Sequence, residues 1–276
     1  MMTSAMKPPD EDQPGWSSAV EAKVRVWDQV RRELRWRLIR ALSLSLCYLL
    51  AAFAVGAYLL QATGSLLDED FLDSLPGTVS PEQLISFLLV AYAIAAVVLL
   101  ALMSFCFLTL FDRLPAGLQP VAAILPSFGS ATSSLSLSAF WSSFYRSVTK
   151  AQPYETAFET ASRELTNPAM RKWASLGALW ISKGHGLEEV FVYAPLSDCS
   201  TRAAAALLKS NRDPERVAEV VERAASGSHQ LAYSRVLRTS RVIFATGILG
   251  SAIVSLFALS GVIYLTYDLI RGLYWW

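Results

Sequence analysis

The 276-residue chain has few of the residues that usually carry enzyme chemistry. It contains only two histidines and three cysteines, and their spacing suits neither a zinc site nor a redox pair. A Walker A sequence is absent, which excludes ATP hydrolysis by a P-loop mechanism, and the GxSxG and SxxK motifs of serine enzymes are absent too. The net charge of +1 gives no indication of nucleic-acid binding. We therefore predict a non-enzymatic protein with no catalytic residue, metal site or cofactor.

Charged residues are missing from three long runs, at residues 41–67, 83–111 and 242–267. Each run exceeds the ~20 residues that an α-helix needs to cross a bilayer core. We predict three transmembrane helices, with Cys47 and Cys106 as small packing residues inside the first two. The first run starts too late and is too long for a cleaved signal peptide, so it is expected to be an uncleaved anchor.

The basic residues indicate how the chain is oriented. Seven lysines and arginines lie between residues 23 and 40, whereas residues 61–83 contain five acids and no basic residue. Because loops rich in lysine and arginine stay in the cytoplasm, the N-terminus is expected inside and the acidic loop outside. Residues 112–241 carry fifteen basic and eleven acidic side chains and are expected inside, which leaves a short tail outside.

A basic amphipathic helix is predicted before the first span, after a polar segment at residues 1–15. Its apolar stripe consists of Val20, Val24, Trp27, Val30, Leu34 and Leu38. The opposite face holds the arginines. Such a helix can lie on anionic lipid, bind a partner, or form a solvated flank to the span, and the residues leave these alternatives open.

The region between the second and third spans is expected to be helical, with no strand pattern. Residues 112–137 contain three prolines and a serine-rich run and are interpreted as a linker. Turn and capping signals then occur at Gln152, Pro153, Asn167, Pro168, Gly184, Gly186, Asp213 and Pro214. No proline follows residue 214, so one helix is expected to run unbroken into the third span.

These signals predict an all-α membrane protein with a cytoplasmic bundle of about six helices. The expected organisation is an N-terminal arm (1–40), a first span (41–62), an acidic loop (63–83), a second span (84–111), a linker (112–137), the helical domain (138–240), a third span (241–267) and a tail (268–276).

Two further patterns allow more than one interpretation. Glu188 and Glu189 follow a Gly-His-Gly break. These two acids either begin a helix after a turn or form a catalytic carboxylate pair, and the turn is favoured. Both His185 and His229 are expected in turns or on the surface. In the third span Gly247, Ser251 and Ser255 recur every four residues. This spacing permits close helix contact, either within the chain or between two copies.

A resemblance to a known family runs through residues 150–191, which read KAQPYETAFETASRELTNPAMRKWASLGALWISKGHGLEEVF. This order of turns and helix starts resembles the type II secretion F domain, found in inner-membrane platform proteins of type II secretion systems and type IV pili. The matching positions are Gln152-Pro153 at the first turn, Ala157-Phe158, the helix start Asn167, and the second turn at residues 184–187. With the spans included, the resemblance covers about residues 138–269. The chain departs from the family at Gln152, at residues 211–215, and in having one domain where most members have two.

The resemblance implies a platform in a bacterial inner membrane, with its N-terminus and helical domain cytoplasmic and its tail periplasmic. Such a protein forms homo-oligomers and works with an assembly ATPase, with pilins or pseudopilins, and with other inner-membrane components of the machine. Candidate contacts with the ATPase are the surface charges Arg171, Lys172, Glu188 and Glu189. The alternative from the residues is a membrane-anchored adaptor or signalling protein whose helical domain binds a soluble partner.

Overall fold

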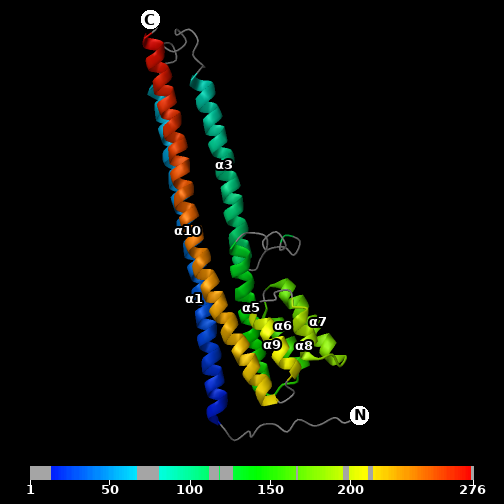
Figure 1. Cartoon of the computed structure of the whole chain (residues 1–276). Helices are drawn as coiled ribbons and strands as arrows, with labels where there is room; N and C mark the ends of the chain where they lie inside the picture. The colour runs from blue at the N-terminus through cyan, green and yellow to red at the C-terminus, as the bar shows by residue number, and fades with distance from the viewer. Residues whose placement is uncertain are drawn as a thin grey trace. The chain divides into compact units, whose positions relative to one another are not determined.

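The computed structural model describes residues 14–66, 81–111, 118, 127–165, 167–194, 199–210 and 214–274 (Figure 1). Within these ranges the ordered elements are helices, and no strand occurs. They are α1 (Pro14–Leu66), α3 (Pro81–Leu110), α5 (Phe128–Thr149), α6 (Tyr154–Glu164), α7 (Pro168–Ser182), α8 (Leu187–Val192), α9 (Cys199–Ser210) and α10 (Pro214–Tyr274). The predicted all-α class is confirmed, and so is the unbroken last helix.

The chain divides into two compact units. The bundle unit comprises Met1–Arg37 and Thr109–Thr239, and the span unit comprises Leu38–Leu108 and Ser240–Trp276. The helices α1 and α10 each contribute residues to both units. Three helices, α1, α3 and α10, are long and apolar enough to cross a membrane, as predicted. We take their uncharged runs, at residues 41–66, 83–110 and 242–267, as the membrane-spanning segments.

The first part of α1, which corresponds to the predicted amphipathic helix of the N-terminal arm, belongs to the bundle unit. Val20 and Val24 are buried in the main core of this unit, and Trp27 packs against it. Leu34, about two turns after Trp27, is buried as well. The apolar stripe therefore packs against protein, because its period of 3.6 residues keeps these side chains on one face.

The predicted linker is also wrong in its second half. The serine-rich residues 128–137 are the first turns of α5. The serine hydroxyls donate hydrogen bonds to backbone carbonyls of their own helix. Ser134 Oγ donates to Ser130 O at 2.7 Å, and Ser138 Oγ donates to Leu135 O at 2.8 Å. A serine that satisfies its hydroxyl in this way can remain inside a helix. Residues 112–117 and 119–126 lie outside the described part of the chain.

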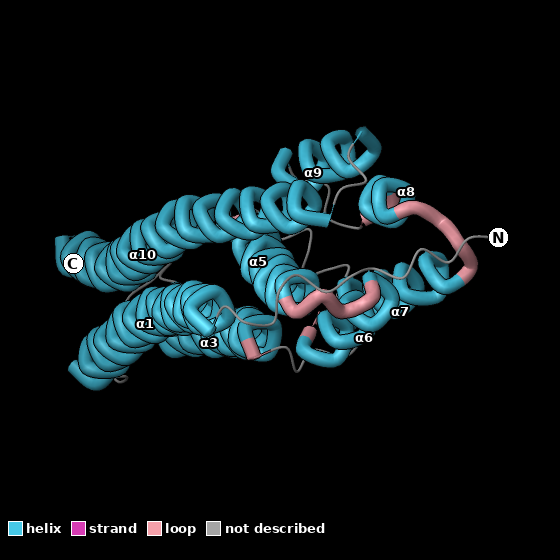
Figure 2. Tube along the Cα trace, turned by 90° about the horizontal axis from the view of Figure 1, so that it is seen from below, coloured by secondary structure: helices cyan, strands magenta, loops and turns pink. Residues whose placement is uncertain are grey.

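The core of the bundle unit is aromatic and is centred on α5. Phe140, Trp141 and Phe144 of this helix are fully buried. They contact rings from the shorter helices. The ring centroids of Phe140 and Trp173 of α7 are 4.8 Å apart, and Trp141 stacks on Phe191 of α8 with centroids 4.9 Å apart. Large rings bury much area per residue, so few short helices suffice to enclose this core. Figure 2 shows the short loops that join α5 to α6 and α7 to α8.

In the span unit, small residues allow the helices to approach closely. Gly247 of α10 is buried against α1, where a Cβ atom in its place would lie 2.9 Å from the Cα atom of Ser45. Ser251 is half-buried and its hydroxyl donates to Ile248 O of its own helix, whereas Ser255 is exposed. The buried face continues instead at Ala258. A spacing of four exceeds the helical period of 3.6, so a strict i, i+4, i+8 stripe rotates away from the contact.

Candidate functional site

A set of hydrogen bonds joins α5 and its N-cap residue to α10 in the bundle unit. We call it the α5–α10 ladder. Its four rungs are Ser127–Thr239, Ser134–Arg235, Ser142–His229 and Tyr145–Glu222. The positions rise along α5 as they fall along α10, so the two helices run antiparallel.

Two rungs lie at the N-cap and in the first half of α5, and one of them has a charged donor. Thr239 Oγ1 donates to Ser127 O at 3.0 Å at the start of α5, and Arg235 Nη1 donates to Ser134 Oγ at 2.7 Å. Hydrogen bonds from a charged donor contribute more than neutral ones, and truncating either partner would leave a polar atom unpaired in the interface. The rungs therefore fix the register of α10 along α5.

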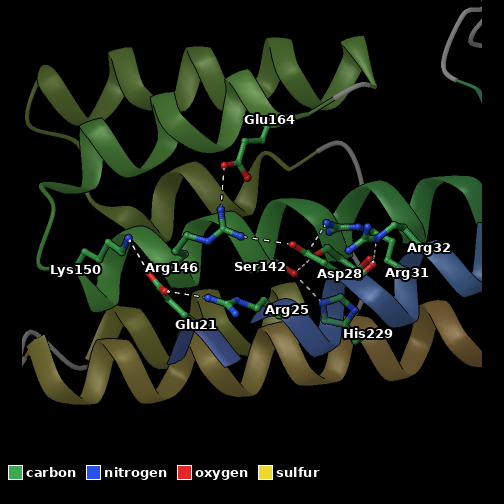
Figure 3. Close-up of polar contacts among 11 residues, drawn as sticks. Glu21, Arg25, Asp28, Arg31, Arg32, Ser142, Arg146, Lys150, Glu164 and His229 are labelled. Carbon is green, nitrogen blue, oxygen red and sulfur yellow. Dashed lines mark hydrogen bonds and ion pairs between the residues drawn. The ribbon is translucent and has the colours of Figure 1, made fainter. Parts of the chain in front are cut away.

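His229 forms the most buried rung. Its Nε2 lies 2.8 Å from Ser142 Oγ (Figure 3). The His229 ring also stacks on Trp27 of α1, with ring centroids 5.1 Å apart. The Ser142 hydroxyl donates its single proton to Ser138 O at 2.8 Å, so it accepts from a protonated Nε2 of the imidazole. Nδ1 is then a bare acceptor, buried and without a partner among the described residues.

Burial keeps His229 neutral. The side chain is 7% exposed, and desolvation, with a further contribution from Arg31, lowers the pKa of His229 to about 4. The expectation of a surface histidine is therefore wrong here, because one position in a long helix carries no sequence signal for burial. An activated serine nucleophile needs an accessible hydroxyl and a histidine that a third group orients. The Ser142–His229 pair is buried, and no described carboxylate contacts Nδ1 of His229, so the pair does not match this arrangement.

Ion pairs attach α1 to the same helices. Asp28 accepts from Arg31 at 2.6 Å and lies 3.6 Å from Arg146 of α5, which in turn reaches Glu164 of α6 at 3.3 Å (Figure 3). Arg31 is largely buried, and desolvation lowers its pKa while Asp28 opposes that shift. Partly exposed pairs of this kind contribute little stability individually. Their effect is to specify which face of α1 meets α5.

A second set of charges lies where α1 meets α10. Lys23 pairs with Glu222, and its ammonium group lies 5.5 Å from the centroid of the Trp27 ring. Glu222 also accepts from Tyr145 Oη at 3.2 Å. Burial, together with the charge of Glu222, raises the pKa of Tyr145 to about 12. Glu222 thus connects α1, α5 and α10 at one point.

The Gly-His-Gly break is a turn between α7 and α8. Gly184 has φ +91°, a left-handed conformation that favours glycine, whereas Gly186 has an ordinary extended φ of −73°. The chain therefore reverses at Gly184, and Gly186 occupies the N-cap position of α8. His185 is exposed as predicted, and its Nδ1 lies 2.7 Å from Glu189 Oε2. The described residues contain no group of metal-binding side chains.

The predicted caps are largely observed. Asn167 Oδ1 accepts from the backbone N–H groups of Ala169 and Met170, and Pro168 begins α7. Pro153 precedes the first residue of α6, and the backbone N–H of Gln152 donates to Ser147 O. Pro214 begins α10, while Asp213 lies outside the described residues.

The four predicted partner contacts have different surroundings. Arg171 and Lys172 are exposed on α7, although Arg171 Nε also donates to Leu165 O at 2.8 Å. Glu188 is half-buried, with its carboxylate against Gly186. Glu189 is exposed and bonded to His185. The two glutamates thus contact the α7–α8 turn, whereas Arg171 and Lys172 form no ion pair within the described part of the chain.

The α5–α10 ladder was not predicted from the sequence. One signal was present: Ser134, Ser138 and Ser142 recur every four residues in a segment that also contains Phe140 and Trp141. Hydroxyls repeated along one face of an aromatic helix indicate a buried polar contact line more readily than a linker. The partners on α10 had no such signal, because they are of four different residue types and do not recur at a constant spacing.

Comparison with known proteins gave no match among protein-family models, curated proteins or solved structures. The class defined by fold and sequence is an all-helical membrane protein with a bundle unit and three candidate spans.

Proposed function

We propose that the chain is a platform protein of a bacterial inner membrane that serves assembly of a type IV pilus or a type II secretion pseudopilus. In this proposal it couples a cytoplasmic assembly ATPase to the movement of pilin subunits. One observation carries the proposal beyond the sequence resemblance. Two helices of the bundle core, α1 and α10, are continuous with candidate membrane spans.

The mechanism follows from this continuity. A force applied to the bundle unit reaches α10 through the α5–α10 ladder and the aromatic core, and reaches α1 through Asp28 and the Lys23–Glu222 pair. Because an α-helix hydrogen-bonds along its whole length, a push or rotation of its first turns is carried along the same backbone. The platform itself needs no catalytic group for this task.

The proposed orientation rests on charge. The basic N-terminal region and residues 112–241 lie in the cytoplasm, whereas the acidic loop and the C-terminal tail are periplasmic. The platform functions as a homo-oligomer with the ATPase, pilins or pseudopilins and other inner-membrane components of the machine. It does not bind nucleic acid.

Deletion of the chain tests this function. Cells that lack it should assemble no pilus or pseudopilus, and expression of the wild-type chain should restore assembly. Purification of the full chain in mild detergent should recover an assembly ATPase or pilins. Filament assembly that continues unchanged after deletion would refute the platform role.

The second candidate function is a membrane-anchored adaptor or signalling protein. The observation that favours it is a group of exposed apolar side chains on α7 and α8, described below, which suits a soluble partner. Recovery of a soluble protein unrelated to filament assembly, together with intact assembly in the deletion strain, would favour the adaptor over the platform.

A further inference from the structure

The outer side of α7 and α8 carries a contiguous apolar face. Leu176 and Leu179 of α7 are 42% and 48% exposed, and Val192 and Tyr193 at the end of α8 are 66% and 67% exposed. Trp180, one turn after Leu176 on α7, is half-buried, and its ring centroid lies 5.5 Å from that of Tyr193. We call these five residues the α7–α8 face. Exposed apolar side chains gathered at one place, rather than scattered singly, mark interaction sites on soluble surfaces.

The rim of this face is basic. Lys172 lies on α7 one turn before Leu176, and Lys183, the C-cap residue of α7, lies one turn after Leu179. Both lysines are exposed. Neither lysine takes part in an ion pair found among the described residues. The helix α7 contains no acidic residue. The nearest acids on α8 are already in contact with the turn, Glu189 with His185 and Glu188 with Gly186.

We propose that the α7–α8 face binds a soluble protein that presents an apolar patch rimmed by carboxylates. Apolar contact would supply most of the affinity, and the lysines would select a partner of opposite charge. The proposal rests on exposure and charge alone and holds for either candidate function. It therefore stands or falls separately from the role in filament assembly.

Two other occupants fit the face less well. A second copy of the bundle unit offers exposed acids on α6, at Glu155, Glu159 and Glu164, but the large exposed hydrophobic residues include none from that helix. An anionic membrane surface usually attracts clusters of four to eight lysines and arginines. The rim of the α7–α8 face has only three basic residues among those described, Lys172, Lys183 and the neighbouring Arg171, which is fewer than such a cluster.

The experiment uses the full chain in phosphatidylcholine nanodiscs and two synthetic helical peptides as probes. Both peptides carry the same stripe of leucines; one has glutamates beside the stripe and the other has lysines. Fluorescence anisotropy should show the wild-type chain binding the glutamate peptide about tenfold or more tightly than the lysine peptide. The preference should weaken as salt is raised, because rim charges are screened.

A charge exchange gives the decisive variant. The double substitution Lys172→Glu and Lys183→Glu should reverse the preference, so that the lysine peptide binds more tightly. The matched control, Arg163→Glu with Arg223→Glu, changes the net charge equally at exposed positions of α6 and α10 and should keep the wild-type preference. Equal affinity for both peptides, or an unchanged preference in the lysine variant, would overturn the proposal.

The apolar contribution and the lipid alternative are tested separately. Leu179→Ser with Val192→Ser should weaken binding of the glutamate peptide at least about tenfold while leaving the helical circular dichroism unchanged, since both side chains are exposed. An environment-sensitive dye on Val192→Cys, in a chain with its native cysteines replaced, should stay in water when nanodiscs contain about one third phosphatidylglycerol. Shielding of the dye by these anionic lipids without peptide would assign the face to the membrane and overturn the proposal.

Discussion

Acidification should destabilise the bundle unit through His229. In the unfolded chain this histidine has an ordinary pKa of about 6.5, whereas burial lowers its pKa in the folded protein to about 4. Between these values the unfolded state binds more protons, so the contribution of His229 to stability is complete above pH 6.5 and is lost as the pH falls. From pH 7 to pH 5 the loss is about 2 kcal/mol, and it reaches about 3 kcal/mol near pH 4.

Thermal unfolding of the full chain, followed by tryptophan fluorescence, measures this loss. For a unit of this size, about 2 kcal/mol corresponds to a decrease of about 4–8 °C in Tm between pH 7 and pH 5. His229→Gln keeps an amide donor for Ser142 Oγ but cannot titrate, so its Tm should change much less over this range. His185→Gln is the matched control and should retain the wild-type dependence. An equal decrease in wild type and His229→Gln would refute the buried, neutral histidine.

Three other substitutions test the packing. Gly184→Val should destabilise the bundle unit by about 1–2 kcal/mol in chemical unfolding, because φ +91° strains a β-branched residue, and Gly184→Asn should cost less; equal stability of both variants would contradict the left-handed turn. Gly247→Val should lower the thermal stability of the detergent-solubilised chain, because the new side chain meets the backbone at Ser45. Gly250→Ala should lower the thermal stability less, and a larger loss in Gly250→Ala than in Gly247→Val would exclude this helix contact. Phe140→Ala should cost about 3–5 kcal/mol by the same unfolding assay, and a loss below about 1 kcal/mol would show that α5 is not central to the core.

The helices could be read from the sequence where local signals agree. Asn167 and Pro168 are an N-cap and a first-turn proline, and the structure uses both in these roles. The absence of proline after residue 214 likewise predicted the continuous α10. The uncharged runs predicted the three candidate spans, because a bilayer imposes a length and a polarity that composition alone reveals.

Tertiary partners could not be read in the same way. The serines of α5 indicated a linker because serine is common in loops, but their buried face meets α10. His229 carried no periodic signal, and its burial depends on Trp27, about two hundred residues away in the sequence. The stripe at Gly247, Ser251 and Ser255 was assigned by an i, i+4 rule, which fails after two turns because the helix has 3.6 residues per turn.

In the proposed platform α10 couples the bundle unit to the membrane, and the substitution Ser240→Pro tests this coupling. This residue begins the span-unit part of α10, and a proline there removes a backbone hydrogen bond and interrupts the helix. In a deletion strain, the Ser240→Pro chain should insert into the membrane and keep a protease-resistant bundle unit but fail to restore filament assembly, whereas Ser240→Ala should restore it. Filament assembly at the wild-type level with Ser240→Pro would contradict the account.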